Sequence, residues 1–207
     1  LFITAFLTLP WWLPKEWMRK QIEGKLSRQL GRKVVLEAFS LNHKGFELRG
    51  LAVGGRQTEN DINVMTIDRI AGPYEPINLL RNQLSRLRVE QVQVNLVIDR
   101  KGRLNIADLP GRLDLEQNRL DLGALVIAQA TLHLRSLNTP DKSAVLDIPH
   151  IGWAGSEKSL HWRLDAQLRG YEDAAIMCSG RTLTPTNGDA HWLQVEFNAE
   201  NLPLQAL

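Results

Sequence analysis

Apolar residues that alternate with polar ones recur through most of this chain, and the alternation repeatedly changes parity. Leu87 and Val89 flank Arg88, for example, but the next apolar positions, Val92 and Val94, have the opposite parity. Successive residues of a strand face opposite sides of a sheet, so an uncorrected change of parity would turn the apolar side chains to the wrong face. A strand that stays in one sheet must absorb the change with a β-bulge or end in a turn.

The changes of parity coincide with three candidate breaks, at Gly50, at residues 90–91 and at residues 123–124. Alternation continues in the C-terminal third, where groups of Gly, Pro, Asn and Asp separate the apolar stretches. This spacing is typical of antiparallel strands joined in a meander. The pattern therefore predicts a mainly β chain with few helices, built on a long antiparallel sheet. No strict sequence period accompanies the pattern, which excludes a short-period solenoid.

Residues 15–30 have a different period and are predicted to form an amphipathic helix. Pro14 suits the first turn, and Gly31 suits a left-handed C-cap. Apolar residues recur at every fourth position along one side of the segment. These residues are Met18, Ile22, Leu26 and Leu30. We expect the stripe to pack on the first strands, with contact to a membrane surface as the alternative. Short helical connectors are expected at residues 74–84 and 106–109.

The N-terminal segment has features of a membrane anchor. Residues 1–9 are an apolar run, which is shorter than the roughly 20 residues that a spanning helix needs. We therefore expect residues 1–14 to be the end of an N-terminal transmembrane anchor. Trp11, Trp12 and Trp17 suit a membrane interface, where an indole ring has one apolar and one wet side. The alternative is the tail of a signal peptide, but no small-residue cleavage pattern follows the apolar run.

Basic residues are dense in the segment 15–33, which fits either a juxtamembrane segment or a solvated helix face.

Both ends of the chain suggest a piece of a longer protein. The chain begins within an apolar run, and residues 202–207 stop on an apolar stretch without a polar tail. The 207 residues, 43% of them hydrophobic and 23% charged, allow one large or two small domains that fold mostly in water.

No constellation of residues predicts an enzyme, a metal site or a cofactor. Cys178 is the single cysteine, so neither an intrachain disulfide nor a thiolate metal cluster can form. The histidines occur in no HExxH arrangement, and no GxSxG elbow is present. Alternation places His133 and His161 on the polar side of their strands. The net charge of +2 is too small to indicate nucleic acid.

The segment 99–105, Asp-Arg-Lys-Gly-Arg-Leu-Asn, is predicted to form a structural corner after a strand that ends at Ile98. Gly102 tolerates a positive φ, and Asn105 can hydrogen-bond to nearby backbone. A binding loop is the alternative interpretation.

Several segments in their order along the chain resemble the N-terminal region of the AsmA-like proteins, the bacterial envelope group that includes AsmA and TamB. The apolar N-terminal end comes first, followed by four short sequences. These are residues 30–34 (LGRKV), 48–53 (LRGLAV), 89–110 (VEQVQVNLVI followed by DRKGRLNIADLP) and 201–204 (NLPL). Each sequence alone is unspecific, but their order extends across nearly the whole chain.

This resemblance implies a single-pass anchor in the bacterial inner membrane, with the bulk of the chain in the periplasm. It also implies that residues 15–31 form a helix and that residues 32–207 form a curved, open β-groove that continues beyond the chain. In such proteins the apolar groove carries phospholipid acyl chains between the inner and outer membranes. The expected partners are therefore membrane lipids, and other envelope or outer-membrane assembly proteins are further candidates.

The lining of the expected groove follows from the parity of the strands. The candidate lipid-lining residues are Val92, Val94, Leu96, Ile98, Leu132, Leu134, Trp162, Leu164, Leu168, Val195 and Phe197. From the pattern alone, a closed barrel or a sandwich with an ordinary filled core is an equal alternative, because either would bury the same faces. The resemblance favours the groove. A periplasmic scaffold for outer-membrane proteins, using strand edges, is the second functional hypothesis, and a hydrolase is a third.

Overall fold

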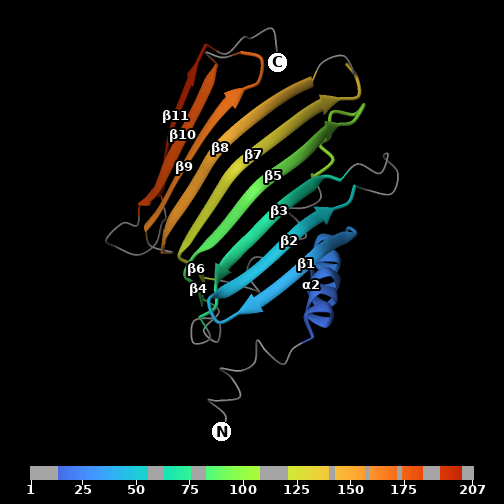
Figure 1. Cartoon of the computed structure of the whole chain (residues 1–207). Coiled ribbons are helices and arrows are strands. Elements are labelled where there is room, and N and C mark those ends of the chain that lie inside the picture. Colours follow the sequence, from blue (N-terminus) through green and yellow to red (C-terminus); the bar gives the residue numbers. More distant parts are fainter. Residues whose placement is uncertain are drawn as a thin grey trace.

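The chain forms one nine-stranded sheet with a helix beside its first strand (Figure 1). The computed structural model describes residues 14–55, 63–75, 83–107, 121–139, 143–156, 159–171, 174–183 and 192–201. In sheet order the strands are β1 (Val34–Asn42), β2 (Gly45–Val53), β3 (Met65–Pro73), β5 (Leu87–Ile98), β7 (Ala124–Ser136), β8 (Ser143–Ser156), β9 (Ser159–Leu168), β10 (Ala175–Leu183) and β11 (Trp192–Glu200). The prediction of a mainly β chain is confirmed.

The sheet is open. Among the described residues β1 and β11 are its two edges and do not pair with each other. The other described sheet is only a pair of two-residue strands, β4 (Gln83–Leu84) and β6 (Asp121–Leu122), of which β6 contacts β8. In Figure 1 the strands twist steadily from β1 at one side to β11 at the other. A closed barrel and a sandwich are therefore not the arrangement of the described strands.

The sheet is mixed, which corrects the prediction of an antiparallel sheet. All neighbouring strands are antiparallel except β5 and β7, which run parallel from Leu87↔Leu125 to Ile98↔Ser136. Parallel neighbours require a crossover connection of a dozen or more residues. Residues 99–123 provide it, and within this connection β6 (Asp121–Leu122) pairs in parallel with β4 (Gln83–Leu84). Alternation of apolar residues does not reveal strand direction, so the sequence could not distinguish the two arrangements.

The helix α2 (Lys15–Leu30) begins and ends where the sequence predicts. Gly31 adopts φ 61° and donates its backbone N–H to the carbonyl of Ser27, as a left-handed C-cap should. The stripe of Met18, Ile22, Leu26 and Leu30 packs against the buried cluster of the first strands. The expected packing on the sheet is therefore confirmed. The helical connector expected at 74–84 lies mostly outside the described residues. The second expected connector was residues 106–109. Asn105–Ala107 form a turn, and residues 108–109 lie outside the described part.

A line of irregular residues crosses six adjacent strands. In each of these strands the pairing with its neighbours skips one residue. Three of the skipped residues have left-handed backbones, namely Gly50 (φ 61°), Gln91 (φ 53°) and Gln129 (φ 59°). The skipped residues are Glu37, Gly50, Asp68, Gln91, Gln129 and Pro149. Two of the predicted breaks are thereby confirmed. The third, at residues 123–124, is also a break, because β6 ends at Leu122 and β7 starts at Ala124 in the other sheet. The change of parity at Gln129 within β7 was not predicted.

Because of this bulge line, a single face of the sheet stays apolar on both sides of it. One row of directly paired residues crosses all nine strands. It consists of Phe39, Leu48, Ile70, Val89, Ile127, Ile151, Leu164, Cys178 and Phe197. A second row lies beyond the bulge line. It consists of Val34, Val53, Met65, Val94, Leu132, Leu146 and Leu168. Leu164 and Leu168 lie four residues apart on β9, which has the regular alternation, so both rows share one face.

Candidate functional site

The structure brings the predicted lining residues together on this apolar face. They come from four strands, β5, β7, β9 and β11, and no charged side chain occurs in the two paired rows of this face. Val92 and Leu168 are buried, and most of the others are half-buried. A face of this kind excludes water only where something covers it, because an alternating strand in a single-layer sheet has one apolar side and one polar side.

Cover over the apolar face decreases from β1 to β11. Near β1, Leu36 is 0% and Val53 is 1% exposed, and they are the largest fully buried side chains among the described residues. The stripe of α2 packs against the buried cluster that contains them. At the other edge Val195 is 48% and Phe197 is 65% exposed. Isolated exposed apolar residues are common on protein surfaces, but Phe197 ends the row that crosses the sheet, and Val195 lies next to it on the same face. The exposed end of the face is therefore the part that an apolar ligand or partner could reach.

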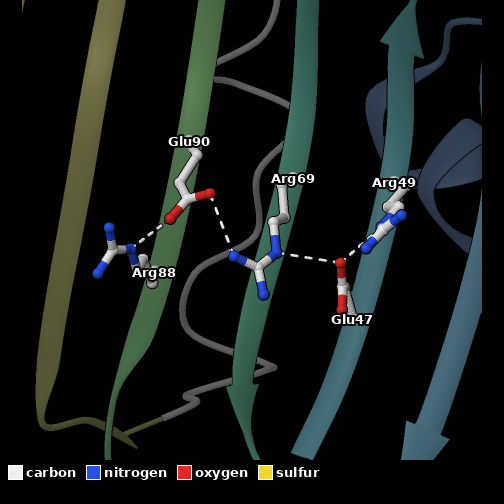
Figure 2. A network of polar contacts seen from close by, with 5 residues as sticks. All are labelled: Glu47, Arg49, Arg69, Arg88 and Glu90. Carbon is white, nitrogen blue, oxygen red and sulfur yellow. Dashed lines mark hydrogen bonds and ion pairs between the residues drawn. The ribbon is translucent and has the colours of Figure 1, made fainter.

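The opposite face carries charges, and sequence reasoning missed how they are arranged. Figure 2 shows a ladder of alternating charge across β2, β3 and β5, made of Arg49, Glu47, Arg69, Glu90 and Arg88. Glu47 Oε1 accepts hydrogen bonds from Arg49 Nε (2.6 Å) and from Arg69 Nε (3.0 Å). Arg69 Nη1 also donates to Glu90 Oε2 (3.2 Å), and Arg88 Nε donates to the other oxygen of Glu90. Because charged groups are stable in contact with water, the face that carries the ladder is the solvent-facing one. The apolar rows lie on the opposite face of the sheet.

The ladder lowers the pKa values of both its carboxyl groups. The hydrogen bond from Arg49 is the largest cause for Glu47, and Arg69 adds to it against a smaller opposing effect of partial burial. For Glu90, partial burial acts to raise the pKa, but the hydrogen bonds from Arg69 and Arg88 together outweigh it. Both groups are thus held as carboxylates on the polar face.

Side chains of α2 occupy the outer backbone edge of β1. Glu23 Oε1 accepts the N–H of Leu36 (2.8 Å), and Arg19 Nη1 donates to the carbonyl of Leu36 (2.8 Å) and to Glu23 (2.9 Å). Ser27 Oγ accepts the N–H of Val34 (3.0 Å). A free strand edge is a template for pairing with another chain, and covering it prevents this. The sequence predicted the packing of α2 but not these polar contacts, which depend on the helix direction along the strand.

The segment 99–105 is a structural corner, as predicted. Asp99 Oδ1 accepts the N–H groups of Lys101 (2.8 Å) and Arg103 (2.9 Å), and Gly102 has φ 77°. The side chain of Asn105 binds the β5 backbone, accepting from one N–H (3.1 Å) and donating to one carbonyl (2.9 Å). The pKa of Asp99 is lowered, first by the backbone N–H of Arg103. All of these groups serve the turn itself.

The predicted membrane-interface residues are placed only in part. Trp17 is 54% exposed on α2, whereas Trp11 and Trp12 lie outside the described residues. Within the part of the chain that the structure describes, no helix is both long and apolar enough to cross a membrane. His133 and His161 project from the face opposite the apolar rows, as their parity predicts.

Comparison with known proteins gave no assignment: no family model matches the sequence, and no curated protein matches it either.

Proposed function

We propose that this chain is a non-catalytic module of the bacterial envelope whose apolar sheet face carries the acyl chains of phospholipids. The observation that supports this function best is the apolar row across all nine strands, on an open sheet whose other face is charged. With the AsmA-like sequence features, it favours a protein anchored in the inner membrane by its N-terminal end. The bulk of the chain then lies in the periplasm and carries lipid between the inner and outer membranes.

The energetics suit a passive carrier. Strands in a sheet are about 4.8 Å apart, so the nine-strand row is roughly 38 Å long. Each CH₂ group of an acyl chain that leaves water on this row contributes about 0.8 kcal/mol. No directional bond fixes an acyl chain on such a surface, so the chain can slide along it while the headgroup stays in water. This mechanism needs no catalytic group.

Site-specific photocrosslinking in cells tests this proposal. A photoreactive residue at Leu164, on the seventh strand of the nine-strand row, should give phospholipid adducts that mass spectrometry identifies. Gln167, which is exposed on the polar face of the same strand, is the matched control and should give none. Leu96, on the apolar face of β5, should behave as Leu164 does. Equal lipid labelling at Leu164 and Gln167 would contradict a lipid-carrying face.

A scaffold for the assembly of outer-membrane proteins is the second candidate function. It is favoured by the outer edge of β11, which pairs with no further strand among the described residues. The same strand carries the exposed side chains of Val195 and Phe197. Such an edge can accept an extended segment of another protein by β-augmentation. Protein adducts without lipid adducts at Leu164 and Phe197 would favour this function over lipid carriage.

A further inference from the structure

The polar face contains a hollow of about 710 Å³ that extends over β7, β8, β9 and β10. Its floor is made of small side chains in two paired rows. Ala124 is opposite Ala154, and Val126 is opposite Gly152. Short side chains on neighbouring strands leave a depression in a sheet whose other positions carry long polar residues. The hollow is therefore a consequence of residue size at four paired positions.

The same two rows continue into longer polar residues that form a wall. Ala154 is opposite His161, which pairs with Arg181, and Gly152 is opposite Arg163, which pairs with Ser179. On the far side the hollow is bordered by Arg86, which directly precedes β5. Arg86 adjoins β5 and Arg181 lies on β10, so these two arginines are four interstrand spacings apart, about 19 Å. Arginine side chains therefore border the floor on both sides.

The charges of the hollow differ from those of the ladder. In the ladder every arginine contacts a carboxylate (Figure 2). In the hollow, Arg163 Nε contacts Asp165 (3.0 Å), but Arg181 Nε donates to the neutral amide of Gln194 (2.9 Å). Among the described residues, neither Arg86 nor Arg181 forms an ion pair with a carboxylate. The bonds of Arg163 and Arg181 use Nε, and each guanidinium carries further donors on its Nη atoms.

We propose that this hollow is a binding site for a phosphate-bearing anion, held by Arg86, Arg163 and Arg181 over the floor of small residues. Guanidinium groups bind phosphate through paired N–H donors, and the planar fork suits two of its oxygens at once. The hydroxyl of Ser179 lies in the same row and supplies a neutral donor. A small apolar floor beneath cationic walls suits a phosphate ester with a compact organic part better than an extended polyanion.

This site is separate from the proposed lipid-carrying face. Arg163 flanks Trp162 and Leu164, which belong to the apolar face, so the hollow is on the other side of the sheet. A phosphate ester bound there could come from a soluble metabolite or from a lipid headgroup. Binding at the hollow and acyl-chain binding on the apolar face therefore succeed or fail independently.

Calorimetric titration of the purified chain tests the site with three probes at constant ionic strength. The probes are inorganic phosphate, glycerol 3-phosphate and dihexanoyl phosphatidic acid below its micellar concentration. Saturable binding of at least one probe is expected. Equal affinity for glycerol 3-phosphate and the lipid identifies a soluble ligand class, whereas preference for the lipid identifies a headgroup. Either result supports the site when it depends on the hollow's arginines.

Substitutions separate the hollow from general surface charge. Arg86→Gln and Arg181→Gln should each weaken binding about tenfold, the effect of one charge-assisted contact. Ala154→Leu should abolish binding by filling the floor without changing any charge. Arg135→Gln is the matched control, because Arg135 is an exposed arginine on the polar face of β7 outside the hollow. It should leave the affinity unchanged.

A gain of affinity provides a test that misfolding cannot imitate. Glu196 is the single acidic residue among the described residues that line the hollow, and Glu196→Gln should strengthen binding several-fold by removing repulsion of the anion. The site is overturned if wild-type protein binds none of the three probes. It is also overturned if Arg135→Gln weakens binding as much as Arg181→Gln does. Lipid binding that is indifferent to Arg86 and Arg181 would be assigned to the apolar face and would likewise reject the hollow.

Discussion

At the scale of single residues, Glu47 shows how the polar face is organised. Its carboxylate lies on β2 and accepts hydrogen bonds from Arg49 on the same strand and from Arg69 on β3. The side chain of Glu47 is 22% exposed, so solvent screens the interaction only in part. Exposed ion pairs contribute little individually, but charges joined in a network with good geometry contribute more. The ladder therefore adds a pH-dependent part to the stability of the first strands.

We predict that Glu47→Gln removes a stabilising effect that is present at neutral pH and absent in acid. The folded-state pKa of Glu47 is lowered, so its contribution is full above the ordinary glutamate pKa and is lost as the pH falls through the lowered value. At pH 7 the variant should be about 0.5–1 kcal/mol less stable than wild type in urea unfolding. This difference should shrink progressively as the pH falls below the ordinary glutamate pKa and through the lowered one. A difference that stays constant across the pH range would refute the ladder's role.

At the scale of elements, α2 combines two functions in one helix. Its apolar stripe covers the buried cluster of the first strands, and its polar residues satisfy the outward N–H and C=O groups of β1. A buried backbone N–H without a partner costs about 1–3 kcal/mol, so the polar contacts matter as much as the stripe. The helix thus ends the sheet at β1, and among the described strands β11 is the edge without such cover.

We predict that Glu23→Ala lowers the free energy of unfolding by about 1–3 kcal/mol, because it leaves the N–H of the fully buried Leu36 without its acceptor. Equilibrium urea unfolding provides the measurement. Lys25→Ala is the control, since Lys25 is exposed on the same helix. If the two variants lose the same stability, then Glu23 contributes no more than an ordinary surface residue and the edge-covering role is wrong.

At the scale of the whole molecule, the bulge line decides that nine strands share one apolar face. Six adjacent strands of the sheet each contain one unpaired residue at this line, so their apolar residues stay on the same side of the sheet despite the change of parity. These strands are β1, β2, β3, β5, β7 and β8. Bulges also increase the local twist of a sheet and bend its strands. Gly50 lies in this line with a left-handed backbone and with the side chain of Glu37 directly over its Cα.

We predict that Gly50→Ala destabilises the protein by about 1–2 kcal/mol or more. A Cβ at φ 61° is strained, and it would lie 2.2 Å from Cδ of Glu37, which must then move. Gly24→Ala is the opposite case, because no atom lies within 4 Å of its added Cβ and the residue is helical. It should stabilise the protein by about 0.5–1 kcal/mol. Thermal unfolding of the two variants should therefore shift in opposite directions, and a shared direction would contradict the role of Gly50.

Sequence reasoning was most successful where the physical cause is local. The limits of α2 followed from Pro14, the four-residue period and Gly31, because capping and helix periodicity depend on neighbouring residues. The breaks at Gly50 and Gln91 followed from parity, since a strand cannot change parity without an irregularity. The further break at Gln129 within β7 was not predicted, because glutamine does not by its residue type indicate a left-handed backbone.

By itself, the sequence determined that most of the chain is strand, which residues share a face and where the helix lies, because side-chain period is a property of each segment alone. The tertiary structure decided the direction of β7, the hydrogen bonds from α2 to the edge of β1, the charge ladder and the hollow beside Arg181. Each of these depends on which strand lies beside which and in what register. That information resides in pairings between distant segments, and no local pattern of residues specifies it.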